Sequence, residues 1–72
     1  MFKNLNAEMV RFEVSKEKLS EILGIALPTL YSRMSSAGFT CAEATIIRDF
    51  FNKNFGTRFT IDYLFANEPI AI

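Results

Sequence analysis

The sequence predicts a small all-α domain built from five helices. Three observations support this fold class. Apolar residues recur at intervals of three and four, which is the period of an amphipathic helix. Residues suited to capping a helix stand just before several of these stretches, and glycines stand just after them. The 72 residues fit one domain, 1–72, and the 50% hydrophobic content is sufficient for one core without cross-links.

The first two helices follow from this spacing. The predicted inward stripe of the first helix contains Phe2, Leu5, Met9 and Phe12. Asn4 or Asn6 is expected to cap that helix. Ser15 is a good N-cap for a second helix over residues 16–23. Gly24 is expected to end it, because glycine readily adopts the left-handed conformation found after helices.

A third, short helix is predicted from Leu27 to about Ser35. Pro28 falls in its first turn, where a missing N–H is tolerated. Leu30 and Met34 form the inward pair, and Gly38 breaks the chain again.

Two more helices complete the domain. Thr40 and Glu43 form the Thr-x-x-Glu pattern of a capping box, which predicts a helix from Cys41 to about Asn54. Its buried face is expected to contain Ala44, Ile47, Phe50 and Phe51. Gly56 ends this helix, and Thr60 caps a last turn over residues 61–65.

Composition excludes several classes of function. The chain has no histidine and no glycine-rich phosphate loop, so we expect no catalytic residue, metal, cofactor or small-molecule substrate. No apolar run approaches the roughly 20 residues that cross a membrane. The single cysteine, Cys41, cannot form an internal disulfide, which favours a reducing cytoplasm. Eight basic and eight acidic residues cancel, whereas DNA-binding domains are usually basic.

The segment of about residues 16–35 has the spacing of a helix-turn-helix. Ser20 lies four residues before Gly24, and Leu30 lies six residues after it. Two short helices that cross closely need a small residue at the contact and a positive φ in the turn. The second helix then needs apolar residues on one side only, which leaves its other side free to bind.

The motif and its flanks resemble a known family. The segment 19–25 (Leu-Ser-Glu-Ile-Leu-Gly-Ile), the segment 28–34 (Pro-Thr-Leu-Tyr-Ser-Arg-Met) and the Gly-Phe-Thr loop 38–40 look like the lambda-repressor and Cro type of helix-turn-helix protein. The stretches 47–56 and 59–65 resemble small regulators of temperate phages of Gram-positive bacteria. The resemblance spans residues 2–65. It implies a five-helix lambda-repressor-like domain, in the cytoplasm of a bacterial host cell, whose third helix meets the DNA major groove.

This sequence departs from that family at the start of the third helix. Relatives usually have Ser or Thr where Ala26 stands, and polar or basic residues where Leu27 and Pro28 stand. Leucine and proline offer no hydrogen bonds to base edges. The residues expected to bind a partner or DNA are Leu27, Pro28, Thr29, Tyr31, Ser32, Arg33, Lys16 and Lys18.

An exposed Leu-Pro-x-x-Tyr ridge is typical of a protein-binding surface. The expected partner is the N-terminal domain of a phage repressor, and the expected role is that of a modulator of repression, or antirepressor, in the lysis/lysogeny switch. The alternative is a Cro-like dimer that binds operator DNA directly. On the leading hypothesis, DNA binding by the protein alone is weak. A structural assembly protein is a third, less favoured class.

Several assignments stay open at this point. Leu27 is either core or exposed, whereas Tyr31 is expected to be exposed. Arg33 is either a phosphate contact or a solvated charge, and Lys16 and Lys18 have the same two alternatives. The cluster of Phe50, Phe51, Phe55 and Phe59 belongs either to the core or to a dimer contact, with the core favoured.

Overall fold

The computed structural model describes residues 2–66, except for the side chains of residues 36 and 37. Within that range it contains helices and no strand, which confirms the all-α class. The elements are α1 (Lys3–Arg11), α2 (Lys16–Leu23), α3 (Leu27–Ser32), the π-helical segment η1 (Arg33–Ala37), α4 (Cys41–Phe55) and α5 (Ile61–Leu64). No described helix is both long and apolar enough to cross a membrane. Residues 1 and 67–72 lie outside the described part of the chain.

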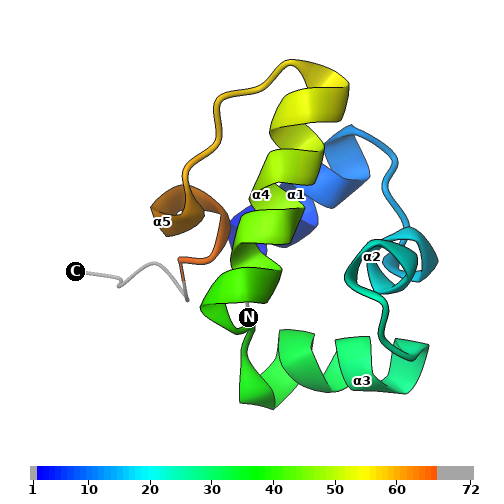
Figure 1. Ribbon diagram of the computed structural model, residues 1–72. Coiled ribbons are helices and arrows are strands. Elements are labelled where there is room, and N and C mark those ends of the chain that lie inside the picture. The colour runs from blue at the N-terminus through cyan, green and yellow to red at the C-terminus, as the bar shows by residue number, and fades with distance from the viewer. Residues whose placement is uncertain (1, 67–72) are drawn as a thin grey trace.

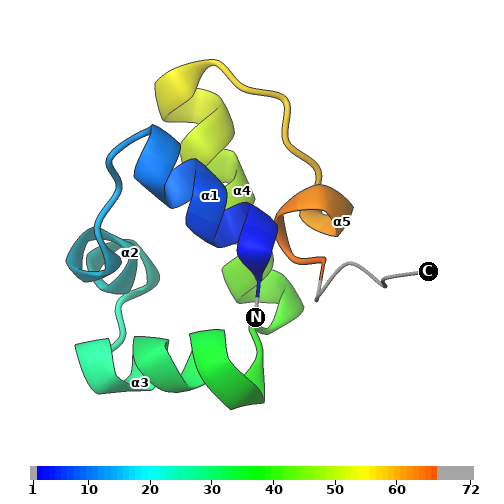
Figure 2. The same cartoon turned by 180° about the vertical axis from the view of Figure 1, so that it is seen from behind.

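The long helix α4 is the centre of the arrangement. Figure 1 shows α1 crossing behind α4, with α2 and α5 on opposite sides of it and α3 along the lower edge. The reverse view in Figure 2 shows α1 in front, uncovered by any other helix. The core between these helices contains Phe2, Leu5, Met9, Val14, Leu19, Leu30, Met34, Ile47, Phe51 and Leu64. Seven of the predicted inward residues therefore share one apolar core: Phe2, Leu5, Met9, Leu30, Met34, Ile47 and Phe51.

Local capping chemistry sets most helix boundaries. The Ser15 hydroxyl accepts a hydrogen bond from the Lys18 N–H at 3.0 Å, and the Thr60 hydroxyl accepts one from the Tyr63 N–H at 3.1 Å. Gly24 and Gly56 follow α2 and α4 in the left-handed conformation. These four predicted boundary residues are confirmed.

The start of α1 differs from the prediction. Asn4 and Asn6 lie inside the helix, and neither caps it. The N-cap is Phe2, in the left-handed conformation and without a side-chain cap. Its ring is buried and lies 5.5 Å from the ring of Phe39 and 5.9 Å from that of Phe65. Aromatic packing therefore holds this helix start, where the sequence suggested an asparagine.

The third predicted helix also differs at its end. The α-helical hydrogen bonds stop at Ser32, and a π-helical turn continues to Ala37. The N–H of Gly38 donates to the carbonyl of Arg33 at 3.0 Å, across the five-residue spacing of a π turn. The predicted end near Ser35 therefore falls inside a wider turn that leads the chain into α4.

The phenylalanine cluster is mainly part of the core. Phe51 is fully buried, and Phe50 and Phe59 pack partly buried against the core. Phe55 is the most exposed member, and its ring stacks on that of Phe12 at 4.6 Å. The favoured assignment to the core holds for Phe50, Phe51 and Phe59, whereas Phe55 lies at the edge of the core.

The contact between α2 and α3 generates a stability prediction. Ser20 is 9% exposed, and its hydroxyl donates to the Glu17 carbonyl at 2.7 Å. Replacing it with leucine places a large side chain in a closely packed site, so Ser20→Leu is expected to lower the free energy of unfolding by about 1–3 kcal/mol. Ser20→Ala, which keeps the small volume, is the matched control. A Ser20→Leu protein with the wild-type denaturation midpoint would contradict the close packing of this site.

Candidate functional site

The turn between α2 and α3 positions the candidate surface. The N–H of Gly24 donates to the Glu21 carbonyl and that of Ile25 to the Ser20 carbonyl, both at 3.1 Å. These two bonds satisfy carbonyls at the end of α2 while the chain reverses, and the positive φ of Gly24 (68°) makes the reversal possible. Ile25 packs against the core. The turn therefore delivers α3 at a defined angle to α2.

The start of α3 lacks the side-chain cap of a usual helix. Its N-cap is Ala26, which makes no side-chain hydrogen bond, as expected for alanine. Pro28 occupies the first turn, where its fixed φ favours the helical conformation. Proline geometry and the anchoring of Leu30 in the core therefore hold a helix of only six residues.

The outward side of α3 carries no charged side chain and mixes hydroxyl groups with apolar groups. We define the α3 face as Leu27, Pro28, Thr29, Tyr31 and Ser32. Pro28 and Ser32 are exposed. Tyr31 is 49% exposed, which confirms the prediction that it is exposed. Leu27 is half-buried against the core, so it falls between the two alternatives of core and surface. Thr29 is also half-buried.

Arg33 belongs to a network that the sequence did not reveal. Its Nε donates to both carboxylate oxygens of Glu43, at 3.1 and 3.2 Å. The same carboxylate accepts the Thr40 N–H at 2.9 Å, while the Thr40 hydroxyl accepts the Glu43 N–H at 3.1 Å. The predicted capping box is thus confirmed, and the structure adds an ion pair from η1 to it. This ion pair gives Arg33 a structural role, in addition to the two alternatives of a phosphate contact and a solvated charge.

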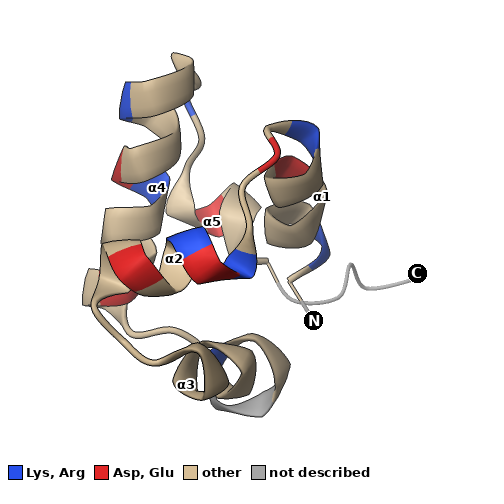
Figure 3. Cartoon of the chain, turned by 90° about the vertical axis from the view of Figure 1, so that its right-hand side faces the viewer, with Lys and Arg blue, Asp and Glu red and all other residues tan. Residues whose placement is uncertain are grey.

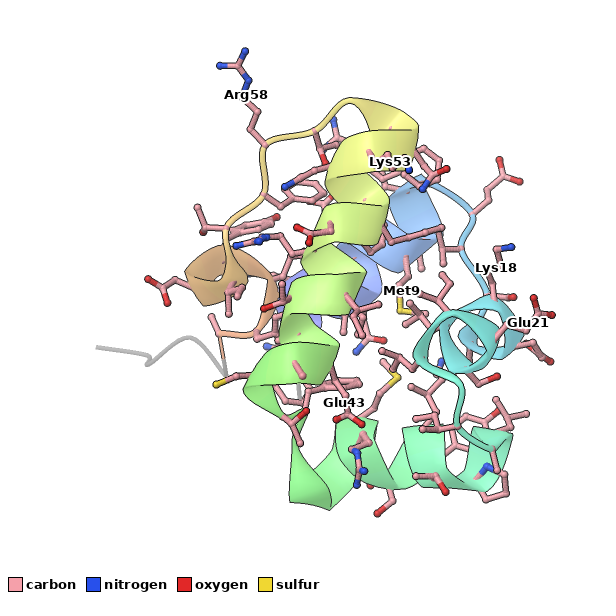
Figure 4. All side chains as sticks on the ribbon, viewed as in Figure 1. Met9, Lys18, Glu21, Glu43, Lys53 and Arg58 are labelled. Atoms are coloured by element: carbon pink, nitrogen blue, oxygen red, sulfur yellow. The ribbon has the colours of Figure 1, made fainter. Side chains whose placement is uncertain are left out.

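The two candidate lysines of α2 lie apart from the α3 face. Lys18 is exposed, and its Nζ is 4.0 Å from Glu21. Figure 4 shows Lys18 on the side of α2 away from α3. Lys16 is half-buried and lines a groove beside α1. The structure therefore brings together the five residues of the α3 face, with Arg33 at its edge, and leaves the lysines elsewhere.

The charges of the molecule are distributed away from α3. Figure 3 shows mostly uncharged ribbon along the lower edge of the molecule, where α3 lies, and mixed basic and acidic residues on α2 and α4. Among residues 2–66 there is no group of three or more His, Cys, Asp or Glu side chains that could hold a metal ion. The α3 face offers one aromatic hydroxyl, two aliphatic hydroxyls and an apolar surface. Such groups suit noncovalent recognition.

A second long-range contact joins α5 to α1, and the sequence did not predict it. The Tyr63 hydroxyl donates to Oε2 of the buried Glu8 at 2.6 Å, which links α5 to α1. This hydrogen bond, followed by burial and the Glu8 charge, raises the pKa of Tyr63. Glu8 Oε1 has no hydrogen bond within the described residues and lies 3.6 Å from Arg11. A glutamate on the inward side of an amphipathic helix was the available signal.

Comparison with protein-family models, with curated proteins and with solved structures found no match to this chain.

The Glu43 network predicts a pH dependence of stability. The Thr40 N–H is the main cause that lowers the pKa of Glu43, and Arg33 lowers it further against the opposing effect of burial. A carboxyl whose pKa is lower in the folded state stabilises the fold above its unfolded pKa of about 4.3. That contribution is lost as the pH falls through the folded pKa. The free energy of unfolding, measured by urea denaturation, should therefore decrease as the pH is lowered from about 5.

The variant Glu43→Gln tests the assignment to this residue. Glutamine can still accept the Thr40 N–H but carries no charge for Arg33, so the variant should be less stable at neutral pH and lose part of the acid dependence. The control is Glu21→Gln, which alters an exposed carboxylate on α2. Equal acid slopes in wild type and Glu43→Gln would show that other carboxyls cause the dependence.

Proposed function

We propose that this chain is a helix-turn-helix regulator of a temperate-phage genetic switch that acts as an antirepressor, by binding the phage repressor protein. In this proposal α2 and α3 form the helix-turn-helix of a lambda-repressor-like domain, and the α3 face contacts the N-terminal domain of the repressor. The protein acts in the cytoplasm of the bacterial host. Its effect on transcription is exerted through the repressor.

One observation carries the proposal: the exposed residues of α3 are uncharged and include an aromatic side chain, Tyr31. Tyr31 stands half-exposed one turn after Leu27, beside the exposed ring of Pro28. Aromatic residues are enriched at the centres of protein interfaces, and charged residues are depleted there. Pro28 also restricts the backbone at the helix start, so little conformational freedom is lost on binding.

The electrostatics of the motif favour a protein partner over DNA. DNA binding draws much of its affinity from cations that neutralise phosphates. The segment between Ser15 and Gly38 contains three basic and two acidic residues, so its net charge is only +1. Of the three, Arg33 is bound to Glu43, and Lys18 points away from α3. The α3 face itself has no cation that could anchor a phosphate.

The proposal predicts that Tyr31 is central to repressor binding. Truncating an aromatic residue at an interface centre costs about 2 kcal/mol or more, which is roughly a thirtyfold loss of affinity. Tyr31→Ala should therefore weaken binding to the repressor N-terminal domain by that factor, measured by calorimetric titration. The melting temperature should stay near that of the wild type, because Tyr31 contributes little to the core. Ile46→Ala, which truncates a comparably exposed residue on α4, is the matched control.

Leu27→Ala separates the two contributions of its half-buried side chain. It should lower both the melting temperature and the affinity for the repressor, since Leu27 packs on the core and also borders Tyr31 in the α3 face. If Tyr31→Ala melts normally and binds the repressor with full affinity, the α3 face is not the interface.

The same electrostatics predict weak DNA binding by the protein alone. Because few phosphates would be neutralised, the affinity for its own promoter DNA should be low and should change little with salt concentration. Fluorescence anisotropy on labelled promoter DNA at several salt concentrations measures both quantities. Operator-specific binding in the nanomolar range at physiological salt would instead establish the Cro-like alternative.

A further inference from the structure

Arg33 follows the α3 face in the chain and keeps most of its hydrogen-bonding capacity. Its Nε donates to both carboxylate oxygens of Glu43, at 3.1 and 3.2 Å. A guanidinium that pairs with a carboxylate frequently uses two parallel N–H groups, one for each oxygen. Here a single nitrogen donates to both oxygens. The guanidinium therefore keeps the N–H donors of Nη1 and Nη2, which have no acceptor within the part of the chain that the structure describes.

The ion pair with Glu43 orients these remaining donors. The side chain of Arg33 is 29% exposed and that of Glu43 is 14% exposed, so the pair is partly shielded from water. The Glu43 carboxylate is itself held by the Thr40 N–H at 2.9 Å. A side chain that is locked by packing and by further hydrogen bonds loses little conformational freedom when a partner binds. A partner that supplies an acceptor would therefore meet donors that are already in position.

The helical backbone places Arg33 beside the α3 face. Ser32 (φ −62°, ψ −43°) and Arg33 (φ −57°, ψ −42°) both have α-helical dihedral angles, so the period of α3 continues through Arg33. Arg33 therefore lies one turn after Thr29, a member of the α3 face. The exposed Ser32 stands between Tyr31 and Arg33 in the chain. A partner that covers Tyr31 and Ser32 needs to extend by only one more residue to reach Arg33.

The shape and the charge of this group indicate which acceptor it suits. The Nη groups of arginine lie in one plane and match the two oxygens of a carboxylate. Glu43 already compensates the charge of Arg33, so the group offers oriented donors and little net positive charge. Duplex DNA draws much of its affinity from net cationic charge, which the α3 face does not add. A single carboxylate on a protein surface is therefore favoured over the phosphate backbone of DNA.

We propose that Arg33 determines specificity at the edge of the α3 face, where its Nη groups bind an aspartate or glutamate side chain of the repressor N-terminal domain. This inference rests on the function proposed above and adds the chemistry of the partner, which is an acidic side chain next to the surface that covers Tyr31. Glu43 is a positioning residue in this arrangement, because it orients Arg33 through the Nε contact and leaves the Nη groups to the partner.

The variant Arg33→Lys tests the role of the planar group. Lysine keeps the positive charge and can still pair with Glu43, but its ammonium cannot offer two parallel donors in one plane. The variant should bind the repressor N-terminal domain about tenfold more weakly in a calorimetric titration, while its melting temperature stays near that of the wild type. Arg48→Lys is the matched control, since Arg48 lies on α4 and donates to Asp49, and it should leave the affinity unchanged.

A double-mutant cycle identifies the acidic side chain on the repressor. Each aspartate and glutamate of the repressor N-terminal domain is replaced by its amide. One of these variants should lose about as much affinity as Arg33→Lys does, and combining the two changes should cause little further loss.

The outcomes separate this inference from the function on which it rests. Full repressor affinity of Arg33→Lys, or additive losses with every acidic residue of the repressor, would overturn the inference and leave the proposed function intact. A loss of affinity for promoter DNA without a loss of affinity for the repressor would also overturn it, because it would assign the Nη groups to phosphate. If the wild-type chain does not bind the repressor at all, the proposed function is wrong, and this inference is wrong with it.

Discussion

The carboxylate of Glu43 joins the two parts of the molecule on which the candidate site depends. One of its oxygens accepts the Thr40 N–H at 2.9 Å and the Arg33 Nε at 3.1 Å. The first bond begins the central helix α4, and the second anchors η1, the continuation of α3. Hydrogen bonds to ionised groups are roughly twice as strong as neutral ones. Together with the burial of Leu30 and Met34 in the core, this side chain couples the position of the α3 face to the start of α4.

This arrangement also determines which charges remain for a partner. An arginine is well suited to bind phosphate because its guanidinium is planar and always ionised. Here the guanidinium nitrogen Nε donates to both carboxylate oxygens of Glu43, so a phosphate at Nε would have to compete with a charge-assisted hydrogen bond. The same interaction that stabilises the fold thus removes positive charge from the edge of the α3 face. The anchoring of η1 to α4 and the engagement of the Arg33 Nε at the edge of the α3 face therefore have one physical origin.

Residues that act within one or two turns of the chain were predictable from the sequence. Ser15, Gly24, Gly56 and Thr60 set helix boundaries through bonds to residues at most five positions away. Contacts across the fold were not predictable in the same way. The ion pair of Arg33 with Glu43 depends on the π-helical turn, and no local sequence pattern predicted that turn. The exposure of Tyr31 followed from helical periodicity, whereas the half-burial of Leu27 depends on how deeply α3 sits on its neighbours.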